Sequence, residues 1–179
     1  ARVVWGDKKL QSELASFWRI VINQGINREN IVSEIGSLRK KIKKNVVDTD
    51  EFPWNIKKGL GGIFDLQLLG QGCALSFYIE SYDTKVHLSS LHKLENWSKS
   101  DGEKIKNLYG LMLKLSQVFA LIGGYRDLNM PLAKFTHNLV LRETEIDSIE
   151  ILKNDLEVSR KWVADIITKK LEIETDRLW

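Results

Sequence analysis

The chain has 179 residues, a length that suits one domain with a sizeable core. Its 27 basic and 24 acidic side chains leave a net charge of +3, too mild to indicate nucleic acid or a membrane as a partner. One cysteine excludes an internal disulfide and favours a reducing cytoplasm, and no apolar run approaches the roughly 20 residues that span a bilayer. We therefore expect a cytoplasmic globular protein, and its two prolines favour helical structure.

Apolar residues at three- and four-residue spacing predict two amphipathic helices at the start of the chain. The first covers residues 7–22, and its expected inward face is Leu10, Leu14, Phe17, Trp18 and Val21. The second follows Gly25, and its expected inward face is Ile31, Val32, Ile35, Leu38 and Ile42. Its last turns carry Arg39, Lys40, Lys41, Lys43 and Lys44. Cations complement the dipole at a helix C-terminus, so we interpret this run as a solvated helix end, with an anion-facing surface as the alternative.

A long connection over residues 45–62 leads into a third helix, expected from about Gly62 to Phe77. Two glycines before an apolar-periodic segment are typical of a loop that feeds a helix N-terminus. Such an end offers backbone N–H groups and a positive dipole end, and Lys57 and Lys58 lie just upstream. On these generic grounds the stretch is a candidate phosphate site.

The interior of this third helix carries two glycines, Gly70 and Gly72. Each costs roughly 1 kcal/mol against alanine, so we expect these small residues to let a neighbouring helix approach closely. The expected inward face of the helix is Ile63, Leu66, Leu69, Cys73, Ala74 and Phe77. Cys73 is accordingly interpreted as a core residue rather than a nucleophile.

The second half of the chain predicts four further helices. We expect a short helix over residues 86–97, a short helix over residues 131–141 and a last helix over residues 146–172. Between the first two lies a long helix that begins at a capping box, Ser100 to Glu103, and ends at Gly123-Gly124. Strand signals are scarce. The predicted fold is therefore an all-α antiparallel bundle of about five to seven helices, with residues 1–179 forming one domain.

Two stretches of the sequence resemble the C-terminal half of glutamine synthetase adenylyltransferases. The family's order of Pro-Trp, lysine, Gly-Gly, Asp-Ile-Glu-Phe and glutamine is similar to Pro53-Trp54, Lys57, Gly61-Gly62, Asp65-Leu66-Gln67-Leu68 and Gln71. Residues 1–7, Ala-Arg-Val-Val-Trp-Gly-Asp, resemble a segment that directly follows the family's nucleotidyltransferase domain. Gln67 and Leu68 depart from the family's glutamate and phenylalanine. The helical domain of PII uridylyltransferases is a more distant alternative.

The resemblance implies a parent enzyme that transfers AMP from ATP to a tyrosine of glutamine synthetase, with Mg²⁺. This chain would be the helical domain that follows the nucleotidyltransferase domain, a fragment without catalytic residues or metal ligands and inactive alone. The implied partners are glutamine synthetase, the PII signalling protein and the preceding domain, with no nucleic acid and no membrane. The alternative is an interaction module that docks glutamine synthetase or PII and never touches nucleotide.

The resemblance also implies which residues help to bind the nucleotide: Lys57, Gly61, Gly62, Asp65 and Gln67. Lys57 would contact a phosphate, the glycines would allow close backbone approach, and Asp65 would orient Lys57 or reach a metal-bound water. Gln67 would replace the family's carboxylate as a hydrogen-bonding group. The structural alternatives are a solvated lysine, a plain turn and a carboxylate stabilised by the helix dipole.

Several other patterns are given a structural interpretation. Gly36-Ser37 followed by Asp48 and Asp50 imitates the Gly-Ser and Asp-x-Asp pattern of nucleotidyltransferases, but Gly36-Ser37 falls inside a helical period, so we reject this match. The three histidines are scattered and do not indicate a metal site. Trp18 and Trp162 are interpreted as packing residues, and Trp5 and Trp54 as part of a surface that faces the preceding domain.

Overall fold

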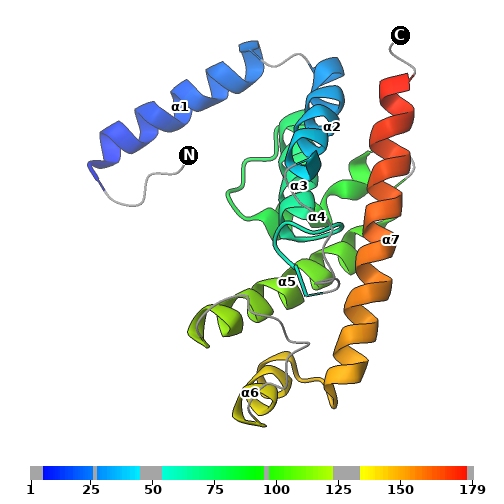
Figure 1. The fold of residues 1–179 in the computed structure, drawn as a ribbon. Helices are drawn as coiled ribbons and strands as arrows, with labels where there is room; N and C mark the ends of the chain where they lie inside the picture. Colours follow the sequence, from blue (N-terminus) through cyan, green and yellow to red (C-terminus); the bar gives the residue numbers. More distant parts are fainter. Residues whose placement is uncertain (1–5, 26–27, 45–53, 95–96, 123–133, 177–179) are drawn as a thin grey trace.

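A computed structural model describes residues 6–25, 28–44, 54–94, 97–122 and 134–176, and within these ranges helices joined by turns and loops are the only regular secondary structure. Seven α-helices and one short 3-10 helix are present in the described part (Figure 1). In chain order they are α1 (Lys8–Gly25), α2 (Arg28–Lys44), α3 (Ile63–Phe77), α4 (Thr84–Ser89), η1 (Leu91–Lys93), α5 (Lys99–Leu121), α6 (Lys134–Thr144) and α7 (Ile149–Asp176). The predicted all-α helical bundle is confirmed, and no described helix is long and apolar enough to cross a membrane.

Helix α3 lies at the centre of the fold, in contact with α2, α4 and α5, while α7 packs against α2 and α5 (Figure 1). The apolar stripes predicted for α3, α5 and α7 meet in one core. Its fully buried members include Leu66 of α3, Met112 and Leu115 of α5, and Leu152 and Leu156 of α7. Helices α2, α4 and α5 therefore surround α3 and fix its position.

The two glycines inside α3 are contact points for neighbouring helices, as predicted. A Cβ atom at Gly72 would collide with Ile35 of α2. A Cβ atom at Gly70 would lie 3.3 Å from side-chain atoms of His87 and Thr84 on α4. Both glycines are buried, so the absence of a side chain is what lets α2 and α4 approach α3.

Helix α5 begins two residues before the predicted capping box, at a different box of the same spacing. The Ser98 hydroxyl accepts from the Asp101 backbone N–H at 3.0 Å, and the Asp101 carboxylate accepts from the Ser98 N–H at 3.2 Å. Trp97, the residue before this cap, is buried in the core and fixes where the chain enters the helix. The helix ends at Leu121, and Gly123-Gly124 lie outside the described residues.

The short helix predicted over residues 86–97 is divided in two. Asp83 caps α4 by accepting from the Lys85 backbone N–H at 2.8 Å, so the helix starts earlier than predicted. The hydroxyls of Ser89 and Ser90 both donate to the Val86 carbonyl at 2.9 Å. Such local side-chain bonds compete with helix propagation, which explains the break before η1.

The inward faces predicted for the first two helices are only partly buried. Leu10 is 65% exposed and Phe17 is 59% exposed, so the prediction that this face of α1 packs into the core is wrong. Ile31 of α2 is buried, whereas Leu38 is 46% exposed. The side chains of Trp18, Val21, Val32 and Ile42 lie outside the described part. In Figure 1, α1 extends away from the other helices.

The last helix begins later than predicted, and the predicted start of the helix before it lies outside the described residues. Helix α6 starts at Lys134 and ends at Thr144, and residues 131–133 are not described. Helix α7 starts at Ile149 rather than Ile146 and continues to Asp176. Its length lets it run beside both α2 and α5, and this places its middle turns against the turn that precedes α3.

Candidate functional site

The predicted site residues belong to one unit, a turn over residues 54–62 that folds onto the start of α3. Within the turn, Gly59 N–H donates to the Asn55 carbonyl at 3.1 Å, and Gly62 N–H donates to the Gly59 carbonyl at 3.0 Å. The first N–H groups of α3 are also used. Ile63 donates to the Ile56 carbonyl at 2.8 Å and Phe64 donates to the Lys57 carbonyl at 3.1 Å.

These bonds change the expectation of an anion site at the start of α3. Helix N-termini attract anions because their first backbone N–H groups have no partner within the helix. Here the turn itself supplies the partners, and the cap residue Gly62 makes no side-chain bond. The amides of Gly59, Gly62, Ile63 and Phe64 are therefore committed within the protein.

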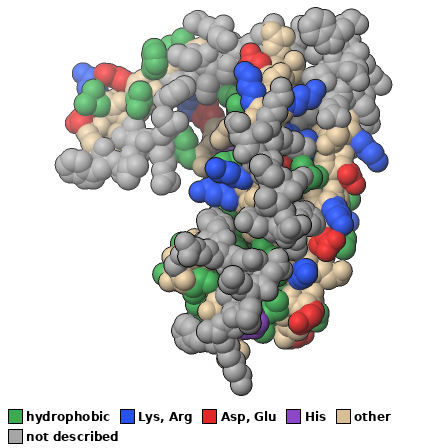
Figure 2. All heavy atoms as spheres, viewed as in Figure 1, with side chains coloured by type: hydrophobic (Ala, Val, Ile, Leu, Met, Phe, Trp, Pro, Cys, Tyr) green, Lys and Arg blue, Asp and Glu red, His purple; other side chains and the backbone are tan. Residues whose placement is uncertain are grey.

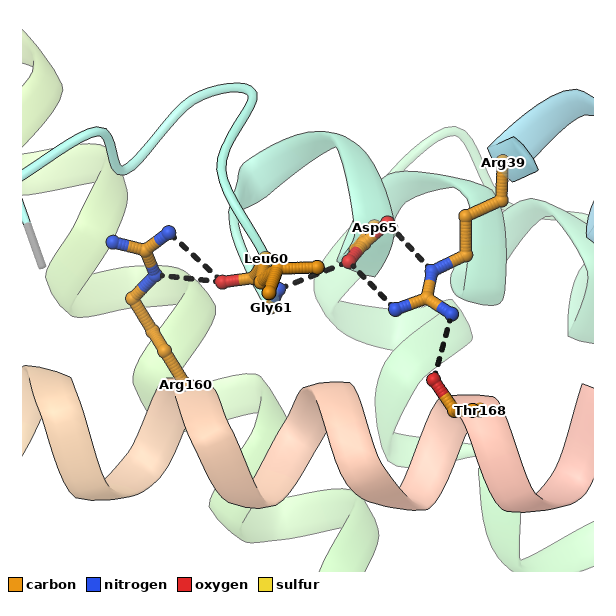
Figure 3. Close-up of polar contacts among 6 residues, drawn as sticks. All are labelled: Arg39, Leu60, Gly61, Asp65, Arg160 and Thr168. Carbon is orange, nitrogen blue, oxygen red and sulfur yellow. Dashed lines mark hydrogen bonds and ion pairs between the residues drawn. The ribbon is translucent and has the colours of Figure 1, made fainter. Parts of the chain in front are cut away.

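Asp65 lies in a buried ion pair that joins three helices (Figure 3). Its two carboxylate oxygens accept from Nε and Nη2 of Arg39 on α2, at 3.0 and 3.2 Å. One of them also accepts from the Gly61 backbone N–H at 2.9 Å. Arg39 Nη1 donates to the Thr168 hydroxyl of α7 at 3.1 Å. Because the side chains of Arg39 and Asp65 are only 6% and 10% exposed, this is an internal contact rather than a solvated one.

A second buried arginine, Arg160 of α7, holds the same turn (Figure 3). Its Nε and Nη2 donate to the Leu60 carbonyl at 3.0 and 2.8 Å, and Nη2 also donates to the Asn55 carbonyl at 3.0 Å. Arg160 is fully buried, so these carbonyls replace the water that a guanidinium would otherwise bind. Asp65 and Arg160 thus bond to the turn directly, and Arg39 joins Asp65 to Thr168; we call this network the arginine clamp.

Gly61 is the position where the clamp requires glycine. Its φ of +63° is a left-handed conformation that other residues rarely adopt, and a Cβ atom there would collide with the backbone carbonyl of Arg160. Gly62 also lies tightly packed, because a Cβ atom would be 2.7 Å from the Ile56 carbonyl oxygen. The close backbone approach predicted for the two glycines is therefore made within this chain: Gly61 lies against α7, and Gly62 lies against the turn.

The remaining predicted residues have different surroundings. Lys57 is exposed, and its amine lies 5.8 Å from the centroid of the Phe64 ring, a weak cation–π contact. Gln67 is half-buried and donates to the Tyr109 hydroxyl of α5 at 3.3 Å. Asp65 pairs with Arg39, so the expectation that its carboxylate orients Lys57 is not met. The structure thus joins Gly61 to Asp65 and leaves Lys57 at the outer edge of the turn.

Two of the sequence interpretations need correction. Trp54, expected on an outward surface, is only 5% exposed and belongs to the core. Arg39, expected in a solvated basic run, is buried in the clamp, whereas its neighbours Lys40 and Lys41 are exposed. The other lysine side chains of that run, and Trp5, are not described.

Sequence reasoning missed Arg160 altogether, although a signal exists. Arg160 follows Leu156 by four residues and precedes Val163 by three, so it occupies the buried stripe of α7. A charged residue at an apolar position is rarely buried without partners, and this one could have been assigned a buried partner. Which partner it has depends on how α7 crosses the turn, and the periodicity of one helix does not specify that.

The other residues considered from sequence are explained by the fold. Cys73 is buried in the core, and burial raises the pKa of its thiol to about 11. Gly36-Ser37 lie inside α2, while Asp48 and Asp50 are outside the described ranges. Trp162 is partly buried and packs against the core, as expected. Among the residues that the structure describes, no group of three or more His, Cys, Asp or Glu side chains is placed to hold a metal ion.

Comparison with known proteins does not assign a family, since the sequence matches no protein-family model and no curated protein. Whether the turn suits a nucleotide is therefore judged from the side chains and amides that the turn presents. Lys57 offers an exposed ammonium that suits a phosphate. Asp65 and the Gly61 amide do not suit that role, because both are already bonded to each other inside the clamp.

Proposed function

We propose that this chain is the helical accessory domain of an adenylyltransferase that modifies a tyrosine of glutamine synthetase, using ATP and Mg²⁺. The observation that carries the proposal is the order of Trp54, Lys57, Gly61-Gly62 and Asp65, which resembles the family and falls within one folded unit. The resemblance at residues 1–7 supports a nucleotidyltransferase domain before this one. The described residues would serve that domain as a wall beside the nucleotide, not as metal ligands.

The clamp gives this wall a physical basis. Two buried arginines attach the turn to α2 and α7, so the turn cannot move independently of the helices. A rigid support holds an exposed side chain within a narrow range of positions, and this precision is what a phosphate contact needs. In this proposal Lys57 contacts a phosphate of ATP, while Gly61, Gly62 and Asp65 position the turn that carries it.

A docking module is the second candidate, and one observation favours it. Four of the backbone amides expected at a phosphate site are already bonded within the turn and α3. In that case the domain binds glutamine synthetase or the PII signalling protein through its surface, and Lys57 contributes nothing to nucleotide affinity. A uridylyltransferase that acts on PII is a further variant of the first proposal, with UTP in place of ATP.

Nucleotide titration separates these candidates in a polypeptide that includes the preceding domain. We expect Lys57→Ala to weaken binding of ATP with Mg²⁺ by about tenfold, the loss of one charged contact to phosphate. Lys153→Ala, which removes an exposed lysine on α7, is the matched control and should leave the affinity unchanged. Equal affinities for the two variants would favour the docking module.

Transfer of labelled AMP to purified glutamine synthetase tests the activity itself. The longer polypeptide should label glutamine synthetase with ATP, and residues 1–179 alone should not. Label that appears on PII with UTP instead would favour the uridylyltransferase variant. A longer polypeptide that modifies neither protein would refute the enzymatic proposal.

A further inference from the structure

We draw no further inference here: the strongest candidate, the apolar surface patch on helix α1 (Figure 2), where Leu10, Leu14 and Phe17 are exposed, carries none because nothing in the part of the chain that the structure describes shows what covers it.

Discussion

Removing one member of the Arg39–Asp65 pair is the sharpest test of the arginine clamp. The two side chains are 6% and 10% exposed and share two hydrogen bonds of 3.0 and 3.2 Å. Breaking a buried pair by deleting one partner typically costs about 3–5 kcal/mol, because the remaining charge stays buried. Asp65→Leu also leaves the Gly61 amide without its acceptor, which adds about 1 kcal/mol. Since a domain is stable by about 5–15 kcal/mol, the variant should be close to unfolding.

A double-mutant cycle separates the ion pair from general damage to the core. We expect Arg39→Met with Asp65→Leu to cost at least about 2 kcal/mol less than the sum of the single variants, because no unpaired charge is left. Urea unfolding followed by circular dichroism measures each free energy of unfolding. Asp65→Asn keeps an acceptor for Gly61 and provides a milder variant if Asp65→Leu does not fold.

An exposed ion pair supplies the control for this cycle. Lys114 and Glu145 lie 3.4 Å apart, with side chains 52% and 81% exposed. Their coupling should stay below about 1 kcal/mol, because water screens both charges. If the changes at Arg39 and Asp65 also add within about 0.5 kcal/mol, the clamp is not a coupled unit and the reasoning is refuted.

Three further predictions follow from the same contacts. Gly61→Ala should cost more than about 2 kcal/mol, because it combines a left-handed φ with a collision at the Arg160 carbonyl. Gly110→Ala in α5 is the control and should be neutral or stabilise by up to about 1 kcal/mol, and thermal melts of the two variants measure the difference. Arg160→Met should destabilise by about 3 kcal/mol in urea, since the Leu60 and Asn55 carbonyls lose their donor, and a cost below about 1 kcal/mol would contradict the clamp. Burial raises the pKa of the Cys73 thiol from 9.0 to about 11, so the protonated thiol stabilises the fold below pH 9 and that contribution is lost between pH 9 and 11. Cys73→Ala should therefore lose less stability than the parent over this range, and identical pH profiles would contradict the assigned cause.

The sequence predicted the helices well because each carries its own period. The apolar stripe of α3 from Ile63 to Cys73 and its close-approach glycines were predicted from local spacing alone and are confirmed. The prediction that Phe77 also faces inward is wrong, because this last residue of the helix is 37% exposed. The start of α5 was predicted two residues too late, because Ser98 and Ser100 both satisfy the same capping pattern. The burial of Trp97 in the core favours the cap at Ser98. The stripe of α1 was misassigned for a related reason, since an amphipathic pattern specifies a face but not what covers it.

The clamp was beyond sequence reasoning because its contacts with α7 join residues 100 or more positions apart. The pairing of Arg160 with Leu60 and of Arg39 with Thr168 depends on how α7 crosses α2 and the turn. When α2 is considered alone, Arg39 belongs to a basic run at a helix end, and when α7 is considered alone, its apolar stripe indicates that Arg160 is buried but not what it contacts. Burial, which is a property of the assembled bundle, is what separates the structural arginines from the exposed lysines beside them.

The clamp gives a structural role to two of the residues that carry the resemblance at residues 53–71. Gly61 and Asp65 are needed to fold the turn whether or not a nucleotide binds, so they fit an enzyme domain and a docking module equally well. Gln67 is compatible with both as well. Its amide donates to the Tyr109 hydroxyl, and a glutamate at this position could accept from the same hydroxyl. Among the five predicted residues, Lys57 is the one whose side-chain charge is exposed and not held in an ion pair of the clamp. The choice between the two candidate functions therefore depends on Lys57, and this is why its substitution, rather than that of Asp65, is the informative one for nucleotide binding.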